Sequence, residues 1–230
     1  MTRISKEEGR PTLEFEKEFF DARRYKNKER MVKRHVLKVL EWASDVVGDD
    51  LLRGEGRKAL DVGCACGYSS QVLDLLGYDT CAVDLSRWGV RQAKQSVRGY
   101  FLVCDAQSEL PFKDGIFDLV TCFDVLEHLQ FPVNAIQHML RICDGTLVCT
   151  TPNKTVEKPV RKIMGDYDES HISAKSASEW EKSIKDNADV KMLKVETFLD
   201  LTSKLLGERM FFKSFKLPSL GLTVRIVARK

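Results

Sequence analysis

The sequence predicts an α/β protein built on a doubly wound, mostly parallel sheet. From Lys58 onward, short apolar runs typical of buried strands alternate with stretches of helical period. Such alternation requires right-handed crossovers, with helices covering both faces of the sheet. A glycine turn, residues 63–67, follows the first apolar run, and folds of this class bind ligands at the carboxyl ends of their strands. A chain of 230 residues has room for one such domain and an extension.

The first part of the chain predicts a helical extension. Residues 13–47 have helical period, with a break near Asn27. In their second half the apolar residues form one stripe that must pack on the main domain: Val32, Val36, Val39, Leu40, Ala43 and Val47. We therefore divide the chain into an N-terminal helical cap, residues 1–57, and a main domain, residues 58–230.

The main domain predicts strands and helices in alternation. The expected strands are residues 58–64, 79–85, 100–105, 117–125 and 145–151, with closing strands at 190–198 and 222–228. The expected helices are residues 68–76, 87–97, 133–143 and 176–187, the last capped by Ser176 with Glu179 three residues on. Residues 154–175 are polar and irregular, which indicates a lid or a mobile loop, and residues 205–217 are apolar enough to wall a pocket.

Composition favours a soluble enzyme. The 37 basic and 34 acidic residues give a net charge of +3, which argues against a dedicated nucleic-acid or membrane binder. No apolar run approaches a membrane span, so we expect a cytoplasmic protein. The seven cysteines show no metal or redox spacing and predict small buried thiols in a reducing compartment.

The glycine turn predicts a nucleotide cradle. Gly63 and Gly67 allow a sharp turn and a close ligand approach, and the following helix directs free N–H groups at the ligand. Asp61, Asp84 and Asp105 each stand at the end of one of three successive strands. Asp84 can accept hydrogen bonds from ribose hydroxyls, and Asp105 from the amine of an adenine. One aspartate at a strand end is commonly a turn former, but three around one turn favour a binding site.

The fourth strand ends in a cluster with acid–base potential. Asp124, Glu127 and His128 stand close together, and a carboxylate beside an imidazole can take a proton from a hydroxyl or an amine. A structural role, with His128 orienting a loop, is the competing interpretation. His171 lies in the irregular segment that follows the fifth strand.

These motifs resemble those of the class I S-adenosylmethionine-dependent methyltransferases. ALDVGCACG is similar to the family's first motif, VDLS to its ribose-binding strand end, CDAQSELPF to its adenine-binding loop and FDLVTCFDVLEHL to its fourth-strand motif. GTLVCTTPN and LTVRIVARK fit the fifth strand and the closing strand. The resemblance implies a Rossmann-like, seven-stranded, mostly parallel sheet with an antiparallel closing strand. Within the family, the motifs are similar to those of the small-molecule branch that includes the O-methyltransferases of ubiquinone biosynthesis.

The resemblance also implies the roles of individual residues. S-adenosyl-L-methionine would be the cofactor and S-adenosyl-L-homocysteine its product. The implied cofactor-binding residues are Asp61, Gly63, Cys64, Ala65, Gly67, Asp84, Leu85, Asp105, Ala106 and Phe123. Ala65 departs from the family, which has glycine there, and we expect its methyl group to require a negative φ. The catalytic candidates are His128 as the base, supported by Glu127 or His171.

The resemblance leaves open whether the protein binds a metal ion. In the ubiquinone branch, and in the small-RNA 2′-O-methyltransferases, the corresponding residues can hold a divalent ion that orients the acceptor hydroxyl. We assign no metal ligand from the sequence, and whether Asp124, Glu127, His128 and His171 hold a metal stays open. Asp124 replaces the glutamate of those branches.

The sequence therefore predicts methyl transfer from S-adenosylmethionine to an oxygen or nitrogen of a small-molecule acceptor. Residues 154–175 and 205–217 would be the acceptor-side segments. One alternative is an RNA methyltransferase that uses the basic residues between positions 23 and 38, although a solvated helix face explains them more simply. The others are a non-catalytic, cofactor-binding partner subunit and, ranked last, an NAD-dependent dehydrogenase, because the turn lacks GxGxxG. Neither the acceptor nor the oligomeric state follows from the sequence.

Overall fold

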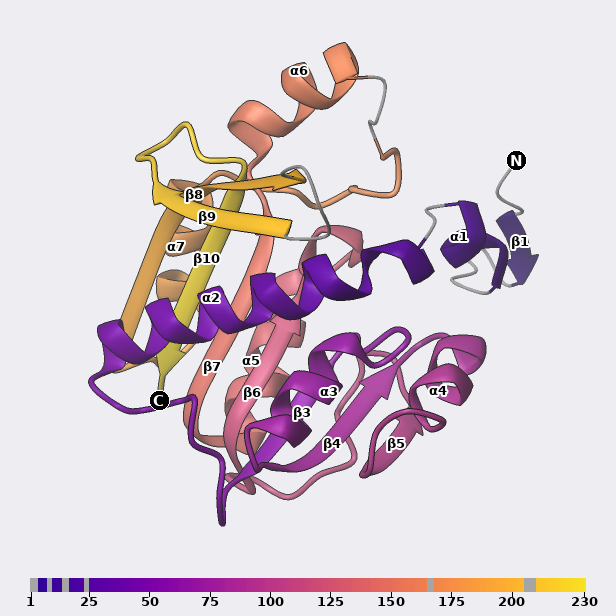
Figure 1. Cartoon of the computed structure of the whole chain (residues 1–230), viewed down its shortest axis with the longest axis vertical. Coiled ribbons are helices and arrows are strands. Elements are labelled where there is room, and N and C mark those ends of the chain that lie inside the picture. The colour runs from indigo at the N-terminus through magenta and orange to yellow at the C-terminus, as the bar shows by residue number, and fades with distance from the viewer. Residues whose placement is uncertain (1–3, 8–9, 14–16, 23–24, 165–167, 205–209) are drawn as a thin grey trace.

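The computed structural model of the chain describes residues 4–7, 10–13, 17–22, 25–164, 168–204 and 210–230 (Figure 1). The main sheet contains β3 (Lys58–Val62), β4 (Asp79–Asp84), β5 (Tyr100–Val103), β6 (Phe117–Phe123), β7 (Cys143–Pro152), β8 (Met192–Lys204), β9 (Met210–Lys216) and β10 (Thr223–Arg229). The helices are α1 (Lys17–Ala22), α2 (Glu29–Val47), α3 (Tyr68–Leu75), α4 (Arg87–Ala93), α5 (Pro132–Ile142), α6 (Lys154–Met164) and α7 (Ala177–Asn187). Short 3₁₀ turns, η1 (Tyr25–Lys28) and η2 (Leu126–His128), and a separate pair of strands, β1 (Ile4–Glu7) and β2 (Arg10–Leu13), complete the elements.

The sheet has the order β5-β4-β3-β6-β7-β10-β8-β9. The pairs from β5 to β7 are parallel, and β10 is antiparallel to both of its neighbours. The strand order reverses beside β3, which is the arrangement that places a ligand site at the carboxyl ends of β3 and its neighbours. The predicted doubly wound fold with an antiparallel closing strand is thereby confirmed.

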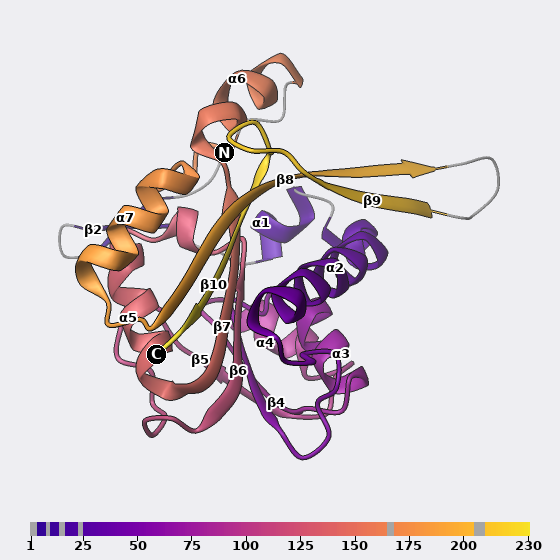
Figure 2. The same cartoon turned by 90° about the vertical axis from the view of Figure 1, so that its left-hand side faces the viewer.

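The predicted number of seven strands is wrong, because the described sheet has eight. The additional strand, β9, pairs antiparallel with β8 and falls in the segment expected to wall a pocket, of which residues 205–209 lie outside the described residues. Two side chains of one face hold β9 to the rest of the protein: the Phe212 ring contacts His35, and Ser214 accepts a hydrogen bond from Arg225 at 2.6 Å. Figure 2 shows this hairpin extending over α2.

The helices cover both faces of the sheet. Helices α2, α3 and α4 lie on one face, and α5 and α7 on the other (Figure 2). The apolar stripe of α2 is confirmed, since Val36, Val39, Leu40 and Ala43 are fully buried in a cluster that also holds residues of β7 and β10. Complete burial of one such aliphatic side chain stabilises the fold by about 1.5–3 kcal/mol. The division of the chain at residue 57 stays a prediction.

Two further expectations about local structure have different outcomes. The capping box of α7 is confirmed: Ser176 Oγ accepts from the Glu179 amide, and the Ser176 amide donates to Glu179. The irregular segment predicted at residues 154–175 is wrong in its first half, which forms α6. Asn153 stands at the start of that helix, where its side chain accepts from the Thr155 amide at 3.2 Å, and the helix continues through Pro159.

The cysteines are free, as predicted. Cys64, Cys66, Cys122, Cys143 and Cys149 are buried, and the other two are partly buried. Burial raises the pKa of the Cys143 thiol to about 12, so that it stays protonated. Across the described part of the chain, none of the helices combines the length and the apolar character that crossing a membrane needs.

Candidate functional site

The glycine turn lies at the carboxyl end of β3 and is fastened to β4. The amides of Gly63 and Cys64 both donate to the carbonyl of Val83, at 2.8 and 3.1 Å. Gly63 and Gly67 have φ values of 79° and 83°, in the left-handed region that favours glycine. A Cβ on Gly63 would lie 2.1 Å from Val125 Cγ2 and one on Gly67 would lie 2.8 Å from Ala93 Cβ, so neither position has room for a methyl group.

Ala65, between these glycines, also has a positive φ, of 48°. The expectation that its methyl group requires a negative φ is therefore wrong. The conformation is held by Asp84, whose Oδ2 accepts a hydrogen bond of 2.7 Å from the Ala65 amide. A hydrogen bond to a charged group stabilises by about 1.5–3 kcal/mol, which is enough to offset the cost of about 1–2 kcal/mol for a left-handed alanine.

Asp61 is buried beneath the turn. Its carboxylate accepts hydrogen bonds from Ser69 Oγ and Ser70 Oγ, both at 2.6 Å, and from Thr121 Oγ1 at 3.1 Å. Burial raises the pKa of Asp61, while the three hydroxyl groups act in the opposite direction. Asp61 thus holds the start of α3 against β3 and β6, and it shapes the cradle from below.

The other cofactor candidates surround the turn. Asp84, at the end of β4, also accepts from the Ser86 amide at 2.7 Å, and Leu85 beside it is 47% exposed. After β5, Asp105 accepts from the Gln107 amide at 2.9 Å, and Ala106 is buried. Phe123 ends β6. The topology therefore brings all predicted cofactor residues to the carboxyl edge of the sheet. Cys64, which is one of them, is buried in the turn.

The catalytic candidates gather after β6. Asp124 has a φ of 53°, and Thr150 holds it through two hydrogen bonds of 3.0 Å, one from the Asp124 amide to the Thr150 carbonyl and one from Thr150 Oγ1 to Asp124 Oδ1. The rings of His128 and His171 lie 4.8 Å apart at 72°. The predicted group of Glu127, His128 and His171 thus comes together although His171 is far away in the sequence.

The carboxylate of Glu127 is buried and unpaired among the residues that the structure describes. Its side chain is 1% exposed, and neither carboxylate oxygen is hydrogen-bonded within the described residues. Burial, and then the negative charge of Asp124, raise the pKa of Glu127 well above its usual range. An uncompensated buried carboxyl is costly, so this position is suited to a charged or hydrogen-bonding group that the protein itself does not supply.

Three residues that sequence reasoning missed orient the two histidines. His128 Nδ1 lies 3.2 Å from the Ser170 carbonyl oxygen and 2.9 Å from Ser170 Oγ, which itself donates to Asp168 at 2.6 Å. Because a carbonyl can only accept, Nδ1 of His128 carries the proton and Nε2 carries the lone pair. His171 Nδ1 is paired with the buried Glu157 of α6. No local pattern identifies these contacts, because they cross between α6 and the loop after it.

The same cluster fits a divalent cation. One ligand atom from each of Glu127, His128 and His171 lies within 4.8 Å of the others. The two unpartnered oxygens of Glu127 and two imidazoles oriented through Nδ1 are the features of a metal site with a supporting outer shell. Asp124 is not in this group, and its Oδ1 accepts from Thr150.

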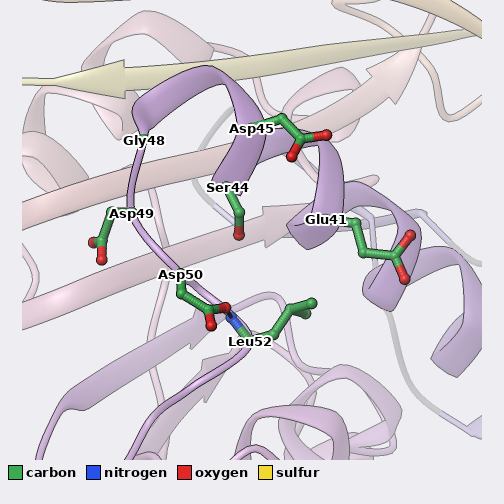
Figure 3. Close-up of a pocket in the computed structure, with 7 residues that line it drawn as sticks. All are labelled: Glu41, Ser44, Asp45, Gly48, Asp49, Asp50 and Leu52. Atoms are coloured by element: carbon green, nitrogen blue, oxygen red, sulfur yellow. Dashed lines mark hydrogen bonds between the residues drawn. The ribbon is translucent and has the colours of Figure 1, made fainter.

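A hollow at the C-terminal end of α2 is not part of this site (Figure 3). It is lined by Glu41, Ser44, Asp45, Gly48, Asp49, Asp50 and Leu52. Asp49 pairs with Arg57 at 2.9 Å and with Arg229 at 3.3 Å, and Asp50 pairs with Arg53 at 3.2 Å. Asp49 and Asp50 are therefore already paired with arginines of the same chain.

A family model described as a methyltransferase domain matches residues 31–193, which is more than half of the chain. The chain belongs to this methyltransferase family. The match covers α2 and the sheet through the first residues of β8, and it confirms the family that the motifs resemble.

Relatives of known name are ubiquinone biosynthesis O-methyltransferases. The protein of Methylococcus capsulatus is 31% identical over 117 residues, which are 48% of this chain and 49% of that protein. The protein of Glaesserella parasuis is 28% identical over 156 residues, 62% of this chain and 65% of that protein. The chain thus matches between about half and two thirds of the length of these relatives.

Solved methyltransferases share the fold. A SAM-dependent methyltransferase of Archaeoglobus fulgidus superposes with a TM-score of 0.68 at 16% identity, over 93% of this chain and all of that one. The magnesium protoporphyrin IX methyltransferase of Synechocystis PCC 6803, solved with bound SAH, gives a TM-score of 0.58 at 21% identity, over 88% of this chain and 86% of that one. At these identities the likeness establishes the fold.

The glycine turn generates a prediction about single methyl groups. Gly67→Ala should destabilise the protein by about 1–3 kcal/mol, because its Cβ would meet Ala93 at 2.8 Å in a left-handed backbone. Ala65→Gly is the matched control: relief of the left-handed alanine is offset by the lost methyl burial and by glycine's entropy, so the stability should change by less than about 1 kcal/mol. Chemical denaturation measures both, and equal destabilisation by the two variants would contradict the geometry of the turn.

Proposed function

We propose that this methyltransferase binds S-adenosyl-L-methionine in the glycine-turn cradle and transfers its methyl group to an oxygen or nitrogen of a small molecule. The observation that carries the proposal is the convergence of the glycine turn, Asp84, Asp105 and the His128 cluster on one sheet edge of a methyltransferase fold. The ubiquinone biosynthesis relatives are named O-methyltransferases, which favours an oxygen nucleophile. Because the match covers only part of the length of these relatives, their acceptor is proposed for this chain and not assigned to it.

In this proposal the cradle binds the cofactor from three sides. The methionine part lies against the glycine turn and the first turn of α3, which Asp61 supports from below. Asp84 accepts from the ribose hydroxyls, with Leu85 against the adenine, while Asp105 and Ala106 meet the adenine edge and Phe123 lies beside the cofactor. Each oxygen of Asp84 accepts one amide hydrogen at 2.7 Å, which fixes the orientation of the carboxylate in the cradle.

The proposed proton acceptor is Nε2 of His128. When bound, S-adenosylmethionine supplies a methyl group that its sulfonium already activates, so the protein has to orient the acceptor and remove its proton. Because Ser170 fixes the proton on Nδ1, Nε2 is the ring nitrogen that would take a proton from the acceptor hydroxyl. Ser170 Oγ in turn donates a hydrogen bond to Asp168, and the negative charge of Asp168 stabilises the imidazolium that forms on His128.

The alternatives have less support. Two of the basic residues that an RNA contact would use are paired within α2, Lys33 with Glu29 at 2.6 Å and Lys38 with Glu41 at 2.5 Å, as expected for a solvated helix face. A non-catalytic partner subunit does not account for two histidines that Ser170 and the buried Glu157 orient. Neither RNA binding nor the oligomeric state is tested by the fold.

Cofactor binding should depend on Asp84. Asp84→Asn should weaken the binding of S-adenosylhomocysteine by about tenfold or more, because loss of a charged acceptor costs about 1.5–3 kcal/mol. Asp79→Asn, at the opposite end of the same strand and exposed, should bind as the wild type does. Isothermal calorimetry measures all three proteins, and a wild type that binds no S-adenosylhomocysteine would refute the proposed function.

Turnover should depend on His128. His128→Asn should lower kcat by about a hundredfold to ten-thousandfold with little effect on cofactor affinity, because the proton acceptor is lost. Release of S-adenosylhomocysteine reports turnover independently of the acceptor, so a panel of phenols, catechols and amines can be screened with one readout. His138→Asn on α5 provides the control, and an active His128→Asn enzyme would exclude this residue as the base.

As an alternative to proton removal by His128, we propose that Glu127, His128 and His171 hold a divalent cation, which would bind through that same Nε2 of His128 and polarise the acceptor hydroxyl. Mn²⁺ should bind chelator-treated protein at a single site, and Glu127→Gln should abolish the binding. Since burial raises the pKa of Glu127, a proton must leave when the cation binds, and the affinity should increase with pH. Calorimetry at two pH values checks this. Glu127→Gln should unfold no earlier than metal-free wild type, and absence of Mn²⁺ and Zn²⁺ binding would exclude the metal.

A further inference from the structure

Three aromatic side chains near the N-terminus contact three different parts of the candidate site. Phe19 and Phe20 belong to α1 and Tyr25 to η1, and we call these three residues the aromatic cover. Phe20 stacks on Trp88, with ring centroids 5.2 Å apart and a 29° interplanar angle. Tyr25 stacks on Tyr68 at 5.2 Å and 6°, and Phe19 meets His128 edge-on at 6.4 Å.

The contacts place each member of the cover beside a different ligand subsite. Tyr68 is the first residue of α3, immediately after the glycine turn, so Tyr25 lies at the end where the amino-acid part of a cofactor would bind. Trp88 is in the first turn of α4, directly after the Asp84 loop, so Phe20 lies at the ribose end. Phe19, through His128, lies at the acceptor end.

The cover is packed onto the site rather than loosely associated with it. Phe20 is 5% exposed and shares a hydrophobic cluster with Ala65, Cys66 and Tyr68 of the glycine turn. Tyr25 packs into the same cluster and against Phe20, at a centroid distance of 5.4 Å. Because α1 has only six residues, it is too short to be stable in isolation and depends on these contacts.

Tyr25 packs beside the glycine turn, close enough to the acids of the cradle to feel their charge. Burial, and then the negative charges of Cys66, Asp61, Asp84 and Asp124, raise the pKa of Tyr25 well above its usual range. The hydroxyl therefore stays protonated at neutral pH and is available as a donor. A cradle rich in carboxylates suits the ribose and the ammonium group of a ligand, whereas the ligand's own carboxylate needs donors in the same place.

We propose that the aromatic cover closes the cofactor end of the site and that Tyr25 is a binding residue for the amino-acid part of the cofactor, with its hydroxyl donating to the ligand's carboxylate. This inference rests on the proposed function, because it takes the cofactor to be S-adenosylmethionine. It assigns separate tasks within the cover: Tyr25 recognises the amino-acid end and Phe20 encloses the nucleoside. It also makes the N-terminal segment part of the binding site rather than a distant appendage.

Two ligands that differ in the amino-acid part test the role of Tyr25. S-adenosylhomocysteine carries the α-carboxylate, and 5′-methylthioadenosine lacks the amino acid but keeps the nucleoside and the sulfur. Tyr25→Phe should weaken binding of S-adenosylhomocysteine about tenfold and leave that of methylthioadenosine within twofold. Phe20→Ala should weaken both ligands and accelerate their dissociation, followed by stopped-flow fluorescence of Trp88. Tyr100→Phe, the same change at a residue that is 72% exposed on β5, should bind both ligands as the wild type does.

The outcomes separate this inference from the proposed function. A wild type that binds neither ligand refutes the proposed function, whereas a Tyr25→Phe protein that binds S-adenosylhomocysteine normally, or loses both ligands equally, refutes only the role of Tyr25. Hydrogen exchange on the wild type provides a second measurement that needs no variant. Amides of α1 and η1 should become more protected when S-adenosylhomocysteine binds, and unchanged protection would overturn the closing role of the cover.

Discussion

The buried carboxylate of Asp61 is the interaction on which the site depends. It accepts hydrogen bonds from two serines of α3 and from Thr121 of β6, and so joins three elements at one point. These bonds fix the helix axis relative to the strand and thereby set the length and direction of the turn between them. The glycine conformations follow from this constraint, because a chain that leaves β3 and enters α3 within five residues has to take left-handed steps.

The two halves of the site have different electrostatics. Around the cradle, each described acid is compensated: Asp61 by hydroxyls and Asp84 by two backbone amides. Around η2 the compensation is incomplete, because the carboxylate oxygens of Glu127 have no hydrogen-bond partner within the described residues and Asp124 adds a second negative charge nearby. The acids of the cradle are thus balanced by groups of the protein itself, whereas the carboxylate of Glu127 at the His128 end is not, in the part of the chain that the structure describes.

The sequence allowed prediction of the features that local chemistry determines. The strands, the helical crossovers, the glycine turn and the acids at strand ends all follow from short-range patterns, and the parallel topology then brings the acids together. Features that depend on tertiary contacts were missed. The polar composition of residues 154–164 and an interior Pro159 concealed α6, whose Asn153 cap was the signal to notice. The pairing of Glu157 with His171 and the stacking of Tyr25 on Tyr68 join residues from different elements, so no window of sequence contains them.

Ala65 shows how one of these tertiary contacts alters the interpretation of a motif. By sequence alone, an alanine in a glycine turn is a departure that calls for an ordinary backbone. The structure keeps the left-handed backbone and supplies the missing stabilisation from another strand, through the bond from the Ala65 amide to Asp84. The residue that the fold uses to hold the turn is therefore also the one proposed to hold the ribose. A ligand that hydrogen-bonds to Asp84 shares the carboxylate oxygens with the amide of Ala65. Ligand binding and the conformation of the turn are therefore coupled.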